Sequence, residues 1–252
     1  VGLPAPDLVI VNDEDLTYAV VRPDDTSLSC LAASLGALRD PMARSLTWSM
    51  LHNLVRDARI DAALFVQAVL EHADDDTEPS TLTVLLNQAL RVTSRYAGPH
   101  TRRALLERLV ADDSTEPSKM TDPAFLHGGW GRLRAAAPGS DAQIVRARAW
   151  LEAAGQARLL GEAGSAQAAA RAREILDGAL PGLELDADMR WRALTALAQL
   201  DAVSADELEA QRKADPTASG ITHHLQASSS MPRQDLKAEV FDRLLNDTAL
   251  SN

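Results

Sequence analysis

Two short acidic blocks hold the residues best suited to chemistry in this chain. Residues 74–78 read Asp-Asp-Asp-Thr-Glu, and residues 112–116 read Asp-Asp-Ser-Thr-Glu. Both fit the pattern Asp-Asp-x-x-Glu, whose carboxylate oxygens are ligands that hard Mg²⁺ prefers. Acids of this kind, projecting from a helix into a cavity, could hold magnesium on a substrate diphosphate. Whether they do so depends on the elements that position them.

Prolines next to the two blocks argue against such a cavity. Pro79 and Pro117 follow the acids directly, and a serine follows each proline. Because proline has no N–H and clashes with the preceding turn, it ends a helix at this point. The acids are then expected in solvated turns between helices, where a carboxylate needs no partner. A magnesium-dependent synthase of the all-α isoprenoid type stays open as an alternative.

Other catalytic motifs are missing from the sequence. No two histidines have the His-Glu-x-x-His spacing that places two imidazoles on one helical face around zinc. Residues 127–130, His-Gly-Gly-Trp, resemble the oxyanion-hole loop of some esterases, but the chain has no Gly-x-Ser-x-Gly turn to supply a nucleophile. His223 and His224 are neighbours, which point about 100° apart on a helix and cannot chelate one ion together. We therefore predict no catalytic and no metal-ligating residue in this chain.

Charge and composition limit the class of protein further. The 36 acidic and 25 basic residues give a formal charge of −11, which repels phosphate backbones and anionic lipids. We expect no nucleic-acid partner and no membrane partner. Only 4% of the 252 residues are aromatic, so the core must come mainly from Leu, Ala, Val and Ile. This composition favours close packing of helix on helix.

The single cysteine and the first residues bear on cellular location and completeness. Cys30 lies in an apolar helical pattern, which favours a small core residue over a nucleophile. One thiol cannot form an internal disulfide, so we expect a cytoplasmic protein. The chain begins Val-Gly-Leu-Pro without an initiator methionine. We expect it to be a fragment of a longer polypeptide.

Start and stop signals of helices fill the chain after residue 26. Three Asp-Pro pairs place an N-cap acceptor before a proline, at residues 40–41, 122–123 and 215–216. Ser140 with Gln143, and Ser204 with Glu207, have the spacing of a capping box. Glycines that could end helices stand at three positions, Gly36, Gly98 and Gly178. These signals predict a series of helices.

An internal similarity refines this prediction. Residues 64–80 and 102–118 both end in Asp-Asp-x-Thr-Glu-Pro-Ser, and the second copy follows the first by 38 residues. A unit of two helices returning after about 40 residues is typical of HEAT and armadillo arrays. Coincidence in a sequence rich in Asp and Ala is the alternative. The predicted fold is all-α, a HEAT/armadillo-like superhelix (solenoid) of helix pairs with a short β segment at its start.

That short β segment is predicted from residues 8–25. Val9 and Val11 alternate with other residues as in a short strand, and so do Leu16, Tyr18 and Val20. The acidic cluster at residues 12–15 favours a solvated turn between them. We expect an extended or β linker over residues 1–25 and the helical domain over residues 26–252.

Several pieces of the sequence, taken in order, resemble one family. They are residues 9–22 (VIVNDEDLTYAVVR), 38–48 (LRDPMARSLTW), 136–143 (AAPGSDAQ), 186–191 (DADMRW) and 215–220 (DPTASG). Together they resemble the C-terminal domain of bacterial aminopeptidase N enzymes, especially the actinobacterial type. The likeness extends over nearly the whole chain.

The resemblance implies a role without chemistry of its own. In that family the zinc ion, the His-Glu-x-x-His helix and the Gly-Ala-Met-Glu-Asn loop lie in an upstream catalytic domain, and neither motif occurs here. The family's C-terminal domain is a superhelix of HEAT-like pairs, joined through a β-rich segment, that encloses the active-site chamber. The implied partners are the chain's own upstream catalytic domain and a peptide substrate. Zinc would be the cofactor of that upstream domain only.

Two residues are candidates for contact with the substrate. The guanidinium of Arg190, beside the indole of Trp191, could meet a carboxylate or side chain of a peptide. The alternative is helix packing by Trp191 with a surface Arg190. A free-standing helical-repeat module that binds a protein segment is the other interpretation of the whole chain.

Overall fold

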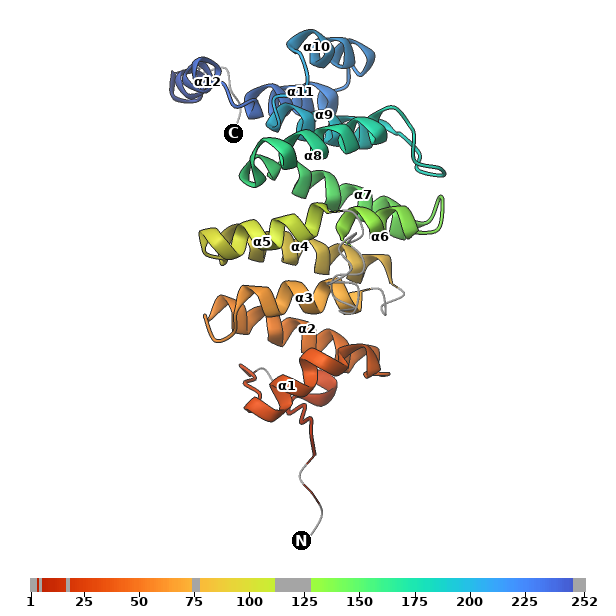
Figure 1. Ribbon diagram of the computed structural model, residues 1–252, viewed down its shortest axis with the longest axis vertical. Coiled ribbons are helices and arrows are strands. Elements are labelled where there is room, and N and C mark those ends of the chain that lie inside the picture. The colour runs from red at the N-terminus through yellow and green to blue at the C-terminus, as the bar shows by residue number, and fades with distance from the viewer. Residues whose placement is uncertain (1–3, 5, 17–18, 74–77, 112–127, 247–252) are drawn as a thin grey trace. The chain divides into compact units, whose positions relative to one another are not determined.

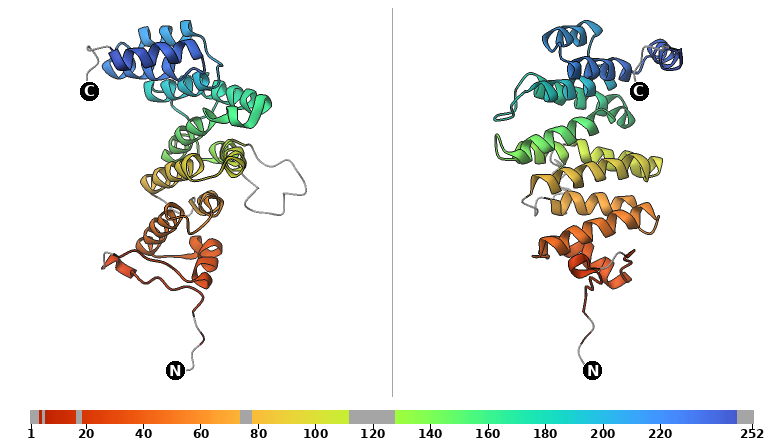
Figure 2. Two further views of the ribbon diagram at one scale, coloured as in Figure 1. Left: turned by 90° about the vertical axis from the view of Figure 1, so that its left-hand side faces the viewer. Right: turned by 180° about the vertical axis from the view of Figure 1, so that it is seen from behind.

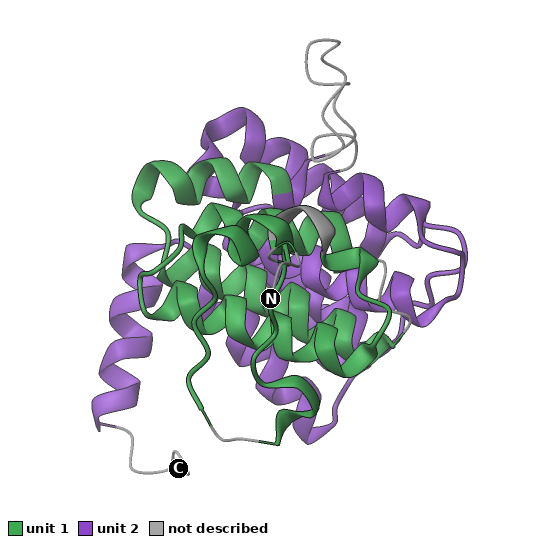
Figure 3. Cartoon of the chain, turned by 90° about the horizontal axis from the view of Figure 1, so that it is seen from below, with its two compact units in different colours: residues 1–108, 113–127 green, residues 109–112, 128–252 purple. Residues whose placement is uncertain are grey.

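The computed structural model describes residues 4, 6–16, 19–73, 78–111 and 128–246. These residues form helices joined by turns and contain no β-strand, so the prediction of an all-α fold is confirmed (Figure 1). They divide into two compact units (Figure 3). Unit 1 runs to residue 108, and unit 2 contains residues 109–111 and 128–246. No helix of the described ranges is both long and apolar enough to cross a membrane.

Unit 1 contains the first helices of the chain. Their bounds are η1 Asp13–Asp15, α1 Asp25–Ser34, η2 Leu35–Ala37, α2 Pro41–Arg56, α3 Ala62–His72, α4 Pro79–Arg95 and α5 Pro99–Val110, of which the last two residues belong to unit 2. Side chains cap two of these helix starts, of which the sequence indicated the one at Asp40. Asp40 accepts from the backbone N–H of Met42, and Asp61 accepts from that of Ala63. The short polar side chain thereby satisfies a donor that the first turn leaves free.

The core of unit 1 lies where α2, α3 and α4 pack together. Leu51, Phe65 and Leu85, one from each helix, are no more than 1% exposed. The rings of Trp48 and Phe65 meet edge to face with centroids 6.2 Å apart. The His52 ring lies 5.7 Å from the Phe65 ring, so an imidazole borders this apolar core.

Unit 2 contains the remaining helices. Their bounds are α6 Gly129–Ala135, α7 Asp141–Ala154, η5 Ala157–Leu160, α8 Gly161–Leu176, α9 Ala187–Gln199, α10 Ala205–Ala214, α11 Ala218–Ser230 and α12 Gln234–Asn246. The predicted caps are confirmed at two starts. Ser140 accepts from the N–H of Gln143, and Ser204 accepts from that of Glu207. The glutamate side chain does not complete the capping box, because it pairs with Arg173 of α8 instead.

Within unit 2 the helices pack mainly on helices close to them in the sequence. α6 lies on α7, α8 lies on α9, and α11 lies along α9 (Figure 2). Trp130 and Trp150 join α6 to α7, with ring centroids 4.7 Å apart and both side chains buried. This arrangement is compatible with helix pairs. The HEAT/armadillo-like superhelix itself stays a prediction.

Two Pro-Gly turns of unit 2 meet at close range. A Cβ atom added to Gly182 would lie 2.4 Å from the backbone N of Gly139 and 2.6 Å from the backbone carbon of Pro138. Gln143 joins the same turns, since its Oε1 accepts from the N–H of Gly139 and its Nε2 donates to the carbonyl of Pro181. Only a glycine at position 182 permits this approach, and it also has a φ of +77°.

The prediction of short strands near the start is wrong for the described residues of that segment. Residues 6–10 and 19–24 have no regular structure, and residues 13–15 form the 3₁₀ helix η1. A strand needs a neighbouring strand to satisfy its backbone groups, and none is present in the described ranges. The helix α1 begins at Asp25, next to the predicted start of the helical domain at residue 26, and the division into linker and helical domain stays a prediction.

One predicted helix start is also wrong. Asp215 ends α10 rather than capping the next helix, and α11 begins at Ala218 with Thr217 as its N-cap. The hydroxyl of Thr217 accepts from the N–H of Gly220. The pair at residues 122–123 lies outside the described residues.

Candidate functional site

The acidic blocks that could hold magnesium fall largely outside the structure's described ranges. These exclude residues 74–77 and 112–116, so a magnesium site at either block stays untested. Glu78 is described and stands at the N-cap of α4 without a side-chain capping bond. Among the described residues, no group of three or more His, Cys, Asp or Glu side chains could hold a metal ion.

The two predicted substrate-contact residues have different surroundings on α9. Trp191 is 1% exposed and belongs to the core of unit 2, whereas Arg190 is exposed. The structure therefore does not present the two side chains as one surface. The placement of Trp191 agrees with the packing alternative. Contact of Arg190 with a substrate stays a prediction.

The Trp191 indole is held by the junction between α10 and α11. Its Nε1–H donates to Oδ2 of Asp215 over 2.9 Å, and the Thr217 hydroxyl donates to Oδ1 of the same carboxylate over 2.6 Å. The bonds from Thr217 and Trp191 hold the pKa of Asp215 below its ordinary value, because both donors favour the ionised carboxylate. Gly220 makes room for Asp215, since a Cβ there would lie 2.2 Å from its backbone oxygen.

Two histidines of α11 border the same indole. The His223 ring stacks on Trp191 at 6.2 Å and 24°, and the His224 ring meets Trp191 edge-on at 6.3 Å. Nε2 of His224 lies 3.7 Å from Oε2 of Glu209, which belongs to α10. A bidentate bond from Arg212 to Glu209, at 2.7 and 2.6 Å, is the main cause of a lowered pKa of that carboxyl group. Three helices therefore meet around Trp191.

Asp188 adds a contact to α7. Its Oδ2 accepts from Nε of Arg192 over 2.9 Å and lies 3.0 Å from Nη2 of Arg148. Burial raises the pKa of Asp188, but the bond and charge of Arg192 and the charges of Arg148 and His223 outweigh it, so the pKa lies below the ordinary value. Both arginine side chains remain 42% exposed, and their guanidinium N–H groups could donate to another carboxylate.

We call the side chains around Trp191 the α9–α11 cluster; its members are Asp188, Trp191, Glu209, Asp215, His223 and His224. Its contacts are hydrogen bonds, ring stacking and ion pairs, and those that join different helices, such as Trp191 to Asp215 and Asp188 to Arg148, fix helices relative to one another inside unit 2. Sequence reasoning identified Trp191 but missed its partners. The i, i+4 spacing of Asp188 and Arg192 was a sequence signal that could have predicted their ion pair. The contact of Trp191 with Asp215 spans 24 residues, and no local pattern in the sequence indicates it.

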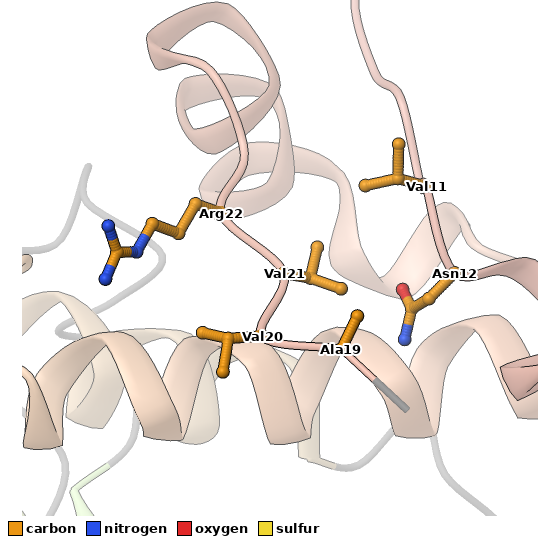
Figure 4. Close-up of a pocket in the computed structure, with 6 residues that line it drawn as sticks. All are labelled: Val11, Asn12, Ala19, Val20, Val21 and Arg22. Carbon is orange, nitrogen blue, oxygen red and sulfur yellow. The ribbon is translucent and has the colours of Figure 1, made fainter. Parts of the chain in front are cut away.

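An open pocket lies in unit 1, beside the first described residues. It has a volume of ≈ 460 Å³ and is lined by Val11, Asn12, Ala19, Val20, Val21 and Arg22 (Figure 4). Val11 is 71% and Val20 75% exposed. Small-molecule sites bury most of the ligand surface. This hollow is open and lined by both apolar and polar groups, so it does not enclose a small molecule in this way.

Together these features define an all-helical domain whose charged side chains serve to join helices. Residues 8–252 match the family model of the ERAP1-like C-terminal domain, and the chain belongs to that family. It is also 30% identical over 254 residues to an aminopeptidase N of Streptomyces lividans. That alignment covers 100% of this chain and 27% of the relative, so the chain spans about a quarter of the relative's length. The resemblance inferred from the sequence is confirmed.

Proposed function

We propose that this chain is the non-catalytic C-terminal domain of a zinc-dependent aminopeptidase, an enzyme that releases N-terminal amino acids from peptides. The observation that carries the proposal is the match along the whole chain to a family of C-terminal domains, together with the similarity to an aminopeptidase N. The relative has nearly three quarters of its length outside the matched part, where catalysis would reside.

We assign the zinc ion of the proposed enzyme to the upstream domain. They contain no group of three His, Cys, Asp or Glu side chains with the arrangement of a metal site. The His-Glu-x-x-His motif that would bind the ion is missing from the sequence as well. In our proposal the ion and the hydrolytic step belong to the upstream domain, which is this domain's partner in a cytoplasmic enzyme.

The proposed role of the helices is to form part of the wall of an active-site chamber. Packing of helix on helix within each unit, such as α3 on α4 and α8 on α9, supports a firm surface that a loop could not provide. A wall that closes over the zinc domain would exclude water and folded proteins and would limit the length of a bound peptide. Domain closures act on enzymes in this way.

The first described residues support a connection to a β-rich region upstream. Val9, Val11, Leu16 and Val20 are all large apolar residues and are between 44% and 81% exposed. Their alternation suits a strand, and the hollow beside them is open. We propose that residues 1–25 pair with that upstream region and lead into α1.

A comparison of substrates tests the proposed function. The full-length enzyme and a form that ends before Thr26 are assayed on a short aminoacyl dye and on a decapeptide. The proposal expects that removal of the domain changes the ratio of kcat/KM between the two substrates and relieves the exclusion of folded proteins. An unchanged ratio and unchanged exclusion would contradict a chamber wall.

A point variant addresses substrate contact without deleting the domain. Arg190→Ala in the full-length enzyme is compared with Arg158→Ala, which removes another exposed arginine of unit 2. If Arg190 meets the peptide, its loss raises KM for the decapeptide and leaves the dye substrate unaffected. Equal behaviour of the two variants would remove Arg190 from the list of contact residues.

A further inference from the structure

The last described helix, α12, presents apolar side chains that nothing in the described part of the chain covers. Phe241 is 63%, Leu244 69% and Leu245 67% exposed, and no residue of the helix is buried. We call these three side chains the α12 apolar face. Spacings of three and four residues put them on one side of the helix. α12 lies to one side of α11 in Figure 1 and in the right-hand view of Figure 2.

The side of α12 opposite this face is polar except for Leu236. Asp235, Glu239, Arg243 and Asn246 lie opposite the α12 apolar face by the 100° rotation per residue. The helix is attached at its first turns, where Leu236 packs against the core of unit 2 and Nζ of Lys237 donates to the carbonyl of Ser229. An amphipathic helix held at one end, with its apolar side in solvent, is typical of a surface that contacts another protein part.

The area of the α12 apolar face decides between two possible occupants, a second copy of this chain and a covalently tethered part of the same polypeptide. Three side chains of this kind, about two-thirds exposed, offer on the order of 300 Å² of apolar surface. A symmetric contact with a second copy would bury about twice that area, below the roughly 1,200 Å² of a stable interface between separate proteins. A covalently tethered partner needs less area, because the tether raises its effective concentration to the millimolar range.

The comparison with known proteins indicates what such a tethered partner is. The relative from Streptomyces lividans has about 73% of its length outside the matched part. Since the matched family is a C-terminal domain, that remaining part precedes it. We propose that the α12 apolar face docks on an apolar patch of the folded region that precedes this domain in the same polypeptide. The inference rests on the proposed placement of the chain in a longer enzyme.

Site-specific photo-crosslinking in the full-length protein tests this contact. Benzoylphenylalanine replaces Phe241 in one variant and Glu239, on the polar side, in a control variant. Both side chains are exposed, so neither replacement disturbs the core. We expect the probe at position 241 to form an intramolecular crosslink to residues upstream of this domain, with a yield at least fivefold above that at position 239. Adding Leu244→Ser should lower the yield at position 241 severalfold.

The other outcomes overturn the inference. A crosslinked dimer on a denaturing gel identifies a second copy as the occupant. Equal yields at positions 241 and 239, or products confined to α11 and α12, mean that the face has no docking partner. The peptide-length assay separates the two proposals. If removal of the domain changes the length preference but no upstream crosslink forms, the chamber wall is retained and the docking is rejected. If the crosslink forms but the full-length protein has no peptidase activity, the docking is retained and the proposed function is rejected.

Discussion

The contact between the two Pro-Gly turns of unit 2 leads to a prediction with a matched control. Gly182→Ala places a Cβ atom 2.4 Å from the backbone N of Gly139, where no flexible side chain can move aside. Gly178→Ala serves as the control, because Gly178 has a similar φ of +72° but nothing within 4 Å of the added atom. The two variants share the conformational strain and differ in the collision.

The expected magnitudes follow from the separate costs. A left-handed backbone costs a non-glycine residue about 1 to 2 kcal/mol, and this is the whole effect expected for Gly178→Ala. In Gly182→Ala the collision forces the turns apart at a further cost of about 1 to 3 kcal/mol. The displaced turns also weaken the two hydrogen bonds of the buried Gln143 side chain, each of which contributes about 0.5 to 1.5 kcal/mol. We expect Gly182→Ala to lower the free energy of unfolding by about 3 to 6 kcal/mol.

Equilibrium unfolding in urea, followed by circular dichroism at 222 nm, measures both variants. The m-value should stay unchanged, since the surface exposed on unfolding is the same. A difference of less than about 0.5 kcal/mol between the variants, within the range of an ordinary surface substitution, would refute the reasoning. The close approach of the turns at Gly139 and Gly182 would then make no measurable contribution to the free energy of unfolding.

Three further predictions concern other sites. Burial and the charges of Arg56 and Arg91 hold the pKa of His52 below its ordinary value of 6.5, so the unfolded chain takes up a proton first as the pH falls. The free energy of unfolding should therefore decrease below about pH 6.5. In urea titrations at pH 7.5 and 5, His52→Gln should show a smaller decrease than the unsubstituted protein, and an equal decrease in both would contradict this prediction. Gly220→Ala puts a Cβ 2.2 Å from the backbone oxygen of Asp215 and should displace the carboxylate from Trp191, which NMR detects as a changed indole N–H shift. An unmoved signal would show that the junction tolerates the methyl group. The Arg148–Asp188 pair is partly exposed, so a double-mutant cycle should give a coupling below about 1 kcal/mol that decreases in salt; a larger, salt-independent value would mean that the pair is shielded from solvent.

Local features of the sequence predicted much of the helical pattern. The caps at Asp40, Ser140 and Ser204 needed only residues within a turn of one another, and the structure has them. Asp215 misled the same reasoning, because its carboxylate binds an indole 24 residues away. The N-cap rule considers only the neighbouring proline and takes no account of the distant indole N–H of Trp191.

The remaining differences also come from distant contacts. The alternation at Val9, Val11 and Val20 is real, but it becomes a strand only beside another strand, which the described residues do not contain. The approach of Gly182 to Gly139 likewise joins turns on either side of α7 and α8. Of the candidate site, the sequence indicated Trp191, while its place in the core followed only from the packing of α9 on α11.

Packing of helices on sequence neighbours has a consequence for how the protein is made. Several helices of the two units find buried surface on an element next to them in the sequence, such as α3 on α4 and α8 on α9. Local contacts of this kind favour rapid folding and allow early helices to assemble during translation. Within this chain α12 gains little buried surface from its neighbours, so in the isolated domain it would fold last and would be the first part to open on heating.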